Sequence, residues 1–139
     1  LMRIFIDTNI LIDFLSIRDK FYEDAKKIFT LGLLRKHELV ISSLSIANAM
    51  YVAHKYGYEN FKEGLQGLFA FLSVADYRGD YVKEALILGW KDYEDSTQFL
   101  SAIGTDCNCI VTRNKGDFEK SSLPVYSPKE FLVLPINYE

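Results

Sequence analysis

The sequence predicts an α/β protein, a three-layer α/β/α sandwich with a central parallel sheet of four to five strands. Short apolar runs such as residues 4–6 and 39–41 are typical of strands that are covered on both faces. Longer segments between them carry apolar residues three and four positions apart, which is the period of an amphipathic helix. Strands that alternate with helices along the chain indicate a parallel sheet with helices on both faces.

Helix start signals and apolar spacing place the elements of the first half of the chain. A short helix follows the first strand, and Asp19 is expected to cap the second helix, because short oxygen side chains accept from unpaired N–H groups. Ser42 or Ser43 caps the next helix, which stops at Gly57. Apolar spacing then predicts a helix over 61–72. The expected strands of the whole chain are residues 2–6, 39–41, a short one at Val74, 109–112 and a last one at Val125.

The second half holds three more expected helices. Asp80 is expected to cap a helix that Gly89 ends, and another helix spans 94–105. Pro128 suits the start of the last helix, where a missing N–H costs nothing. The two cysteines, at positions 107 and 109, are one residue apart, and the alternation of side chains along a strand does not favour a disulfide. We expect them to be free, as in an intracellular protein.

Length and composition fit one globular domain, which we expect to span residues 2–139. Of the 139 residues, 49% are hydrophobic and 25% are charged, which excludes a disordered chain. No apolar run approaches the roughly 20 residues that span a bilayer and no signal peptide is visible, so we expect a cytoplasmic protein without membrane contact. The net charge of −3 gives no global attraction for nucleic acid, which would need a local basic patch.

The most informative polar residue is Asp7, which directly follows the first apolar strand. Open α/β sheets bind their ligands at the carboxyl ends of the strands. Asp7 could cap the helix that follows, or it could bind Mg²⁺ or Mn²⁺ as a hard oxygen ligand. A single acid after a single strand leaves both interpretations open.

A second candidate acid stands at the start of the helix over 94–105. Apolar residues follow Asp95 at +4, +7 and +8, so its carboxylate heads the helix face that must contact the sheet. Glu94 heads a polar face and is expected to be solvated, whereas Asp92 is a helix cap or a further ligand. The alternative role of Asp95 is to stabilise the helix dipole, an effect of about 0.3–1 kcal/mol.

Oxygen-bearing side chains also follow the strand over 109–112. Thr112, Asn114 and Asp117 repeat the arrangement seen at Asp7. Arg113 and Lys115 add the positive charges that a phosphate would need. The alternatives are a turn closed by the Asn and Asp side chains and an ordinary solvated loop.

Asn48 lies on the apolar stripe of the helix that ends at Gly57, so its amide is expected to project inward. An inward amide needs hydrogen-bond partners. It either makes a structural hydrogen bond or lies beside the candidate metal site, and the sequence favours neither.

Together these segments resemble the PIN-domain family of metal-dependent ribonucleases. The resemblance runs from Ile4 to Phe131 and rests on Ile-Asp-Thr-Asn at 6–9, Asp-Tyr-Glu-Asp at 92–95 and Val-Thr-Arg-Asn-Lys-Gly-Asp-Phe at 111–118. It implies an α/β/α sandwich whose acids converge around Mg²⁺ or Mn²⁺. Many bacterial and archaeal members are toxins of VapBC-type toxin–antitoxin pairs, inhibited by a small partner protein, and members are often homodimers.

The resemblance also implies a catalytic set. Asp7 and Asp95 match two of the family's acids and would bind the metal, with Asp117 as a direct or water-mediated ligand. Asn48 and Asn114 stand where the family usually or often has acids, and they would orient water. Amides in place of two acids resemble a distinct branch of the family. Because an amide oxygen adds no charge and cannot help to deprotonate water, we expect a single-metal site of weak affinity, with activity that is low or dependent on substrate contacts.

The substrate would be contacted by residues that surround these acids. Thr8, Asn9 and Thr112 would offer backbone or hydroxyl groups, and Arg113 and Lys115 would position a phosphate.

These roles give a leading hypothesis and two alternatives. The leading one is a Mg²⁺/Mn²⁺-dependent endoribonuclease, the toxin of a toxin–antitoxin pair. The first alternative is a weakened or inactive PIN-like module that binds RNA or protein. The second is a phosphotransfer protein of the receiver or haloacid dehalogenase type. It is disfavoured, because dehalogenase-like enzymes need a second Asp two residues after the first and position 9 is Asn.

Overall fold

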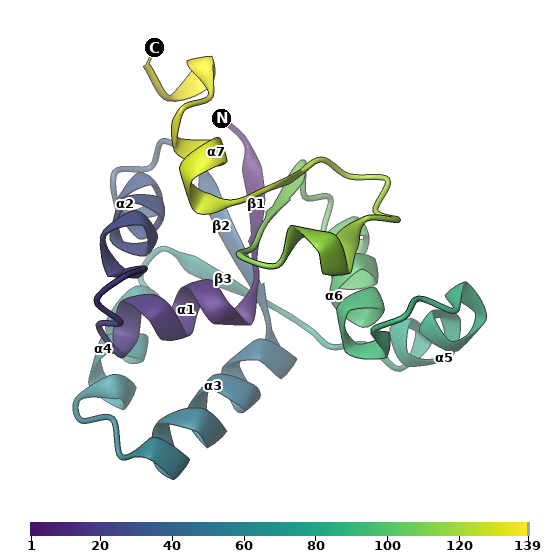
Figure 1. Ribbon diagram of the computed structural model, residues 1–139, viewed down its shortest axis with the longest axis horizontal. Coiled ribbons are helices and arrows are strands. Elements are labelled where there is room, and N and C mark those ends of the chain that lie inside the picture. Colours follow the sequence, from purple (N-terminus) through teal and green to yellow (C-terminus); the bar gives the residue numbers. More distant parts are fainter. Residues whose placement is uncertain (139) are drawn as a thin grey trace.

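A computed structural model describes residues 1–138 and confirms the predicted three-layer α/β/α fold (Figure 1). Its sheet has five strands, all parallel, in the order β3-β2-β1-β4-β5. The strands are β1 (Arg3–Ile6), β2 (Glu38–Ser42), β3 (Leu72–Ala75), β4 (Cys109–Val111) and β5 (Val125–Tyr126). From β1 the chain adds β2 and β3 on one side of the sheet, and it then crosses back to add β4 and β5 on the other side of β1. The direction in which strands are added therefore reverses between β1 and β4.

Helices connect successive strands and form the two outer layers (Figure 1). The α-helices of the described residues are α1 (Thr8–Leu15), α2 (Tyr22–Leu33), α3 (Ser43–Tyr56), α4 (Phe61–Leu68), α5 (Gly79–Leu88), α6 (Tyr93–Gly104) and α7 (Pro128–Leu132). Two 3₁₀ turns, η1 (Lys115–Phe118) and η2 (Pro135–Tyr138), complete the fold. None of the helices within residues 1–138 has the length and apolar character needed to cross a membrane.

The side chains of the central strands alternate between two apolar cores, one on each face of the sheet. In β1, Ile4 and Ile6 pack into the core formed with α1, α2, α3, α4 and α7. Phe5 points the other way, into the core formed with α5, α6 and η1. Burial on both faces explains why these strands are continuously apolar in the sequence.

Several helix ends lie where the sequence predicts them. The hydroxyl of Ser42 accepts from the N–H of Ser45 at 3.1 Å and caps α3. Gly57 and Gly89 end their helices in the left-handed conformation, with φ of +65° and +64°, which glycine adopts without strain. Pro128 is the first residue of α7, as expected.

Two predicted caps are wrong. Asp19 does not cap α2, which begins at Tyr22 without a side-chain cap. The backbone carbonyl of Arg18 accepts from the N–H groups of Phe21 and Tyr22 at 2.9 and 2.7 Å, so a backbone turn performs this role. Asp80 lies inside the first turn of α5, where its carboxylate accepts from Arg78 Nε at 2.9 Å.

The helix predicted over 61–72 ends earlier, at Leu68. Leu72 begins β3, where it lies opposite Leu39 of β2. Pairing with β2 therefore overrides the helical spacing of the sequence. Cys107 and Cys109 are buried and free, as predicted, and burial raises the pKa of the Cys109 thiol to about 12.

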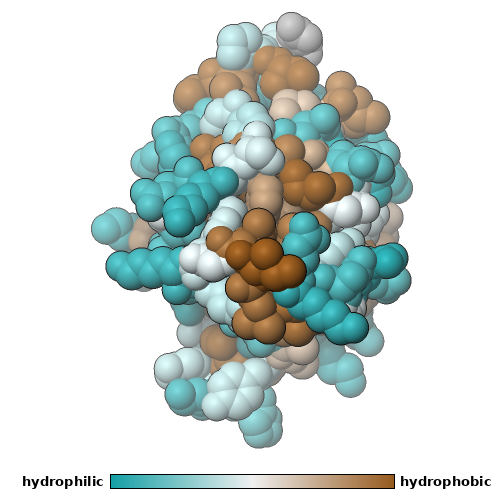
Figure 2. All heavy atoms as spheres, turned by 90° about the vertical axis from the view of Figure 1, so that its right-hand side faces the viewer, coloured by the Kyte–Doolittle hydropathy of each residue, from teal (hydrophilic) through white to brown (hydrophobic). Residues whose placement is uncertain are grey.

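One helix carries an apolar outer surface. Tyr81 and Ala85 of α5 are buried against α6, whereas Leu86 and Ile87 are 72% and 85% exposed. Figure 2 shows apolar side chains gathered in the middle of the molecular face on which α5 lies, among hydrophilic residues. We refer to Leu86 and Ile87 as the α5 patch.

Candidate active site

The reversal of chain direction between β1 and β4 places Asp7 at the carboxyl edge of the sheet. Ile6 of β1 pairs with Val111 of β4, and the N–H of Asp7 donates to the carbonyl of Val111 at 3.0 Å. Such a reversal opens a crevice at the strand ends, because the two connecting segments diverge to opposite faces of the sheet.

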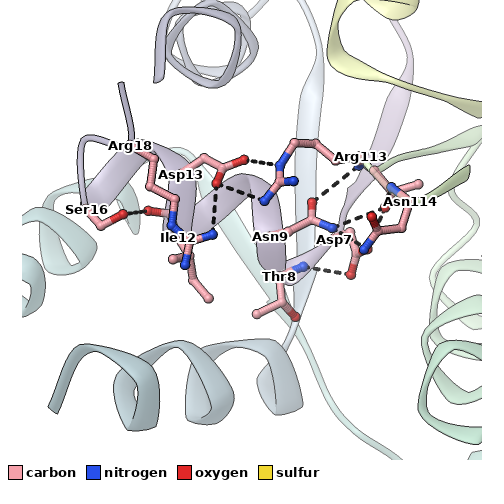
Figure 3. Close-up of polar contacts among 10 residues, drawn as sticks. Asp7, Thr8, Asn9, Ile12, Asp13, Ser16, Arg18, Arg113 and Asn114 are labelled. Atoms are coloured by element: carbon pink, nitrogen blue, oxygen red, sulfur yellow. Dashed lines mark hydrogen bonds and ion pairs between the residues drawn. The ribbon is translucent and has the colours of Figure 1, made fainter. Parts of the chain in front are cut away.

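The carboxylate of Asp7 is held by residues that come from both strand ends. Oδ1 accepts from the N–H of Thr8 at 2.8 Å, so Asp7 is the cap of α1 (Figure 3). Oδ2 accepts from the hydroxyl of Thr112 at 2.6 Å and from the amide of Asn9 at 3.3 Å. Asp7 is only 7% exposed, and burial raises its pKa, although the bonds from Thr112 and Thr8 oppose the rise.

A pocket of about 310 Å³ opens above Asp7. It is lined by Asp7, Thr8, Asn9, Ile12, Arg18, Asp92, Glu94, Asp95, Asn114 and Asp117, and we call it the acid pocket. It brings together Asp7, Asp95 and Asp117, the three predicted metal ligands. The lining also includes the predicted residues Thr8, Asn9 and Asn114. Carboxylates outnumber cations in this lining, where Arg18 is the basic residue.

Asp95 is a second lining residue whose pKa is raised. Burial is the largest cause, and the negative charges of Asp7, Asp92, Asp117 and Glu94 add to it, so that its pKa rises to about 7. Its own N–H donates to Asp92 Oδ1 at 3.0 Å, which makes Asp92 the cap of α6. The carboxylates of this pocket thus repel one another, an arrangement that a bound cation would relieve.

Asn48 contacts the acid pocket through Glu94. The amide of Asn48 donates to the carboxylate of Glu94 at 2.9 Å. Burial and the charges of Asp92 and Asp7 raise the pKa of Glu94. Glu94 is exposed, as predicted, but it also lines the acid pocket, a place that the sequence did not suggest.

The polar face of α6 behind Glu94 is not solvated. Thr97, Gln98 and Ser101 are all buried. Thr97 accepts a hydrogen bond from the hydroxyl of Tyr77 at 3.0 Å, and the amide of Gln98 donates to Ser45 Oγ at 3.0 Å. These hydrogen bonds compensate for the burial of Thr97 and of the Gln98 amide nitrogen, whereas Gln98 Oε1 and Ser101 Oγ are buried without a hydrogen-bond partner among the described residues. The sequence pattern reveals neither outcome.

The two predicted phosphate-binding cations are engaged with other acids. Arg113 Nε lies 2.5 Å from Asp13 Oδ2, and its guanidinium carbon lies 3.9 Å from the centre of the Phe21 ring. Lys115 Nζ lies 2.9 Å from the carboxylate of Glu130. Neither cation lines the acid pocket, and their role toward substrate stays a prediction.

The donor chemistry of the acid pocket suits Mg²⁺ or Mn²⁺, which prefer carboxylate oxygens and retain several waters. The mutual repulsion at Asp95 is a second property that fits a cation. As the side chains stand in residues 1–138, however, no three His, Cys, Asp or Glu groups converge closely enough to hold an ion. An ion held by all three acids would require side-chain rotation within the pocket, whereas one or two carboxylates with water are enough for Mg²⁺.

Sequence reasoning missed Arg18 and Ile12 in the lining. Ile12 lies four residues after Thr8, so helical spacing on α1 would have placed it on the same side. Arg18 lies beyond the end of α1, where its side chain also contacts Asp13 at 3.4 Å. No feature of the sequence indicates that contact.

Comparison of the sequence with known proteins identifies the family of this chain. A family model described as PIN domain matches residues 3–116, and the chain therefore belongs to the PIN-domain family. The chain is 23% identical over 134 residues to Ribonuclease VapC1 of Aquifex aeolicus (strain VF5), covering 93% of this chain and 92% of the relative. The predicted family is confirmed.

Solved structures share this fold, and one of them is a toxin–antitoxin complex. A toxin–antitoxin complex from Klebsiella pneumoniae aligns with 25% identity and a TM-score of 0.64, covering 89% of this chain and 96% of that chain. VapBC2 from Rickettsia felis, bound to a DNA fragment from the promoter, aligns with a TM-score of 0.68 and 21% identity. The alignment covers 89% of this chain and 97% of that chain. The second likeness shows the fold alone.

Proposed function

We propose that this protein is a Mg²⁺- or Mn²⁺-dependent endoribonuclease that hydrolyses RNA phosphodiester bonds. The observation that carries the proposal is the acid pocket, where carboxylates from the ends of β1, α6 and η1 surround one crevice. Membership of the PIN-domain family and similarity to a VapC ribonuclease support it. We propose that residues 2–139 act as one domain, of which Glu139 lies outside the described residues.

Asp7, Asp95 and Asp117 would hold the divalent ion, which when bound supplies charge stabilisation at the phosphate oxygens and lowers the pKa of a coordinated water. The protein's own contribution is to position these acids. Thr112 and Thr8 hold the carboxylate of Asp7 from two sides, at 2.6 and 2.8 Å.

Glu94 lines the acid pocket and is the pocket residue that Asn48 contacts. Asn48 cannot supply negative charge, but its amide donates to Glu94 at 2.9 Å and orients that acid. We propose that Glu94 compensates for Asn48, and that Asn114, which lines the pocket, orients water. The acid count of the pocket then remains sufficient for one ion.

The proposed substrate is single-stranded RNA that enters the acid pocket. Thr8 and Asn9 line it, but the hydroxyl of Thr8 donates to Ser45 Oγ at 2.6 Å and the amide of Asn9 donates to Asp7 at 3.3 Å. The hydroxyl of Thr112 is likewise engaged with Asp7, so each of these side chains would exchange a hydrogen bond to contact the RNA backbone. Arg113 and Lys115 border the segment that carries Asn114, and positioning of phosphate by either cation requires release from its acidic partner.

A cleavage assay with a matched control tests the proposal. Wild-type protein is expected to cleave RNA with Mn²⁺ and to stop when EDTA is added. Asp7→Asn should reduce cleavage at least a hundredfold and weaken Mn²⁺ binding measured by calorimetry. Asp106→Asn, at the exposed opposite end of α6, is the control and should behave as wild type. Equal cleavage by wild type and Asp7→Asn would refute the assignment.

The amides favour one second candidate, a weakened or inactive PIN-like module that binds RNA or protein. Asn48→Glu, alone and combined with Asn114→Asp, distinguishes it from a weakened nuclease. Restored charge should tighten Mn²⁺ binding and raise cleavage if the site is a nuclease. RNA or protein binding without any gain in cleavage would favour the module.

Toxin activity with an antitoxin partner, a cytoplasmic location and a homodimer are further parts of this proposal. The similar toxin–antitoxin complex supports an antitoxin. The exposed Leu86 and Ile87 of the α5 patch support association with a second copy, since large exposed apolar groups favour contact with protein. Sedimentation equilibrium should show a dimer that Leu86→Asp with Ile87→Asp converts to a monomer.

A further inference from the structure

A second and larger pocket adjoins the acid pocket. It has a volume of about 480 Å³ and is lined by Trp90, Lys91, Asp92, Gly116, Asp117, Glu119 and Lys120. Asp92 and Asp117 line both pockets, so the two spaces are neighbours. We call the larger one the tryptophan pocket. Its volume falls in the range of pockets that bind small organic molecules.

The aromatic wall of this pocket is rigidly supported. Trp90 stacks on Phe99 with ring centres 5.0 Å apart and an interplanar angle of 25°, and its edge-to-face contact with Phe118 is 6.1 Å. Both phenylalanines are buried, while Trp90 is half-buried and still lines the pocket. A fixed, partly exposed indole costs little entropy to use and offers a stacking surface that any nucleobase fits.

Two cations line the same pocket. Lys91 and Lys120 are exposed, and neither occurs in the ion pairs of residues 1–138. They are therefore available to a phosphate, in contrast to Arg113 and Lys115, which have acidic partners. Glu119 adds an acceptor that suits an N–H group of a base.

Gly116 leaves room in the wall. A Cβ at this position would meet no heavy atom within 4 Å, so the space next to it is open. Its backbone does not have the positive φ that would exclude other residues. A larger side chain at position 116, in the lining of the pocket, thus meets no obstacle at its Cβ and no backbone strain.

We propose that the tryptophan pocket binds one nucleotide of single-stranded RNA, next to the phosphate that enters the acid pocket. The base stacks on Trp90, and Lys91 and Lys120 attract its phosphate. This inference rests on the proposed ribonuclease function, because the shared walls at Asp92 and Asp117 make the nucleotide a neighbour of the cleaved bond. It assigns a substrate subsite to residues outside the acid pocket.

The test uses intrinsic fluorescence, because Trp90 is the single tryptophan of the chain. A fluorescein-labelled five-nucleotide uridine RNA is titrated in EDTA, which prevents cleavage. Anisotropy then reports binding, and unlabelled RNA is used to follow Trp90 emission. We expect the RNA to quench Trp90 over the same concentration range as it binds. Ribose 5-phosphate, which lacks a base, should not quench.

Three sets of variants test base stacking on Trp90, attraction of phosphate by the two lysines, and the space beside Gly116. Trp90→Ala should weaken binding by roughly tenfold or more, as for loss of one stacked base, while Trp90→Phe restores most of it. Lys91→Gln with Lys120→Gln should lower the slope of log affinity against log salt by about 0.7 for each phosphate contact removed. Gly116→Leu should abolish quenching in a folded protein, whereas Gly67→Leu, in α4 and also in open space, should not.

The outcomes distinguish the two proposals. RNA that binds or is cleaved without a change in Trp90 emission would overturn the subsite and leave the ribonuclease proposal standing. Base-dependent quenching that Gly116→Leu removes would support the subsite even if no cleavage occurs, and the ribonuclease proposal would then fail. Absence of both binding and quenching would overturn the subsite.

Discussion

Replacement of Arg113 by Met is expected to destabilise the fold strongly. Asp13 of α1 is 1% exposed, and its carboxylate is held by Arg113 Nε at 2.5 Å and Nη2 at 3.2 Å (Figure 3). The substitution leaves a buried negative charge whose remaining partner is Arg18 at 3.4 Å, itself half exposed. A methionine fills much of the same volume but offers no hydrogen bond.

The magnitude follows from the burial of Asp13. Removal of one partner from a buried ion pair costs about 3–5 kcal/mol. Arg18 retains part of the interaction, whereas the contact of Arg113 with the Phe21 ring adds about 0.5–1 kcal/mol to the loss. We therefore expect a loss of about 3 kcal/mol, which for 139 residues corresponds to a fall in Tm of about 10 °C.

A double-mutant cycle with urea unfolding, followed by Trp90 fluorescence and circular dichroism, measures this effect. Asp13→Leu combined with Arg113→Met removes both charges and should recover most of the stability, because no buried charge is left unpaired and Arg18, which loses its partner, is partly exposed to solvent. Arg78→Met removes an exposed cation that also pairs with an acid, and should cause no measurable change.

Two results would refute the reasoning. One is a loss below about 1 kcal/mol for Arg113→Met, since a buried unpaired carboxylate costs more. The other is a strictly additive double mutant, which would show that Asp13 and Arg113 do not interact. A stable Arg113→Met protein that loses RNA affinity would instead support the phosphate-binding role that the sequence suggests.

Three further variants test other parts of the structure. The pKa of Asp95 is raised to about 7, so the folded state binds the extra proton between about pH 4 and 7 and loses stability as pH rises through that window. Asp95→Asn in EDTA should therefore be more stable than wild type at pH 8, by about 1–2 kcal/mol after screening, with no difference near pH 4, by thermal unfolding. Ser127→Ala removes the capping box of α7 and should cost about 1 kcal/mol in urea, and an unchanged midpoint would contradict the assigned cap. Gly104→Ala places a Cβ against the hydroxyl of Tyr81 and should cost about 1–3 kcal/mol, part of which Tyr81→Phe restores if that hydroxyl is the obstacle.

Local patterns predicted the strands and the carboxyl-edge acids because those signals involve few residues. Burial on both faces makes β1 and β2 continuously apolar, and the first residue after β1 reaches the carboxyl edge wherever that strand lies in the sheet. The left-handed helix ends at Gly57 and Gly89 are local in the same sense. The caps proposed at Asp19 and Asp80 failed, because a backbone carbonyl and an early helix start replaced them.

The sequence by itself determined the fold class, the family and the position of Asp7 at the end of β1. Only the tertiary structure decided which groups surround that acid. Glu94 joins the acid pocket, where the amide of Asn48, 46 residues away in the sequence, donates to it, and Asp92 lines the same pocket. Arg113 is paired with Asp13, which is 100 residues away. The direction of a side chain depends on how neighbouring elements pack, and the spacing of apolar residues along one element does not reveal that packing.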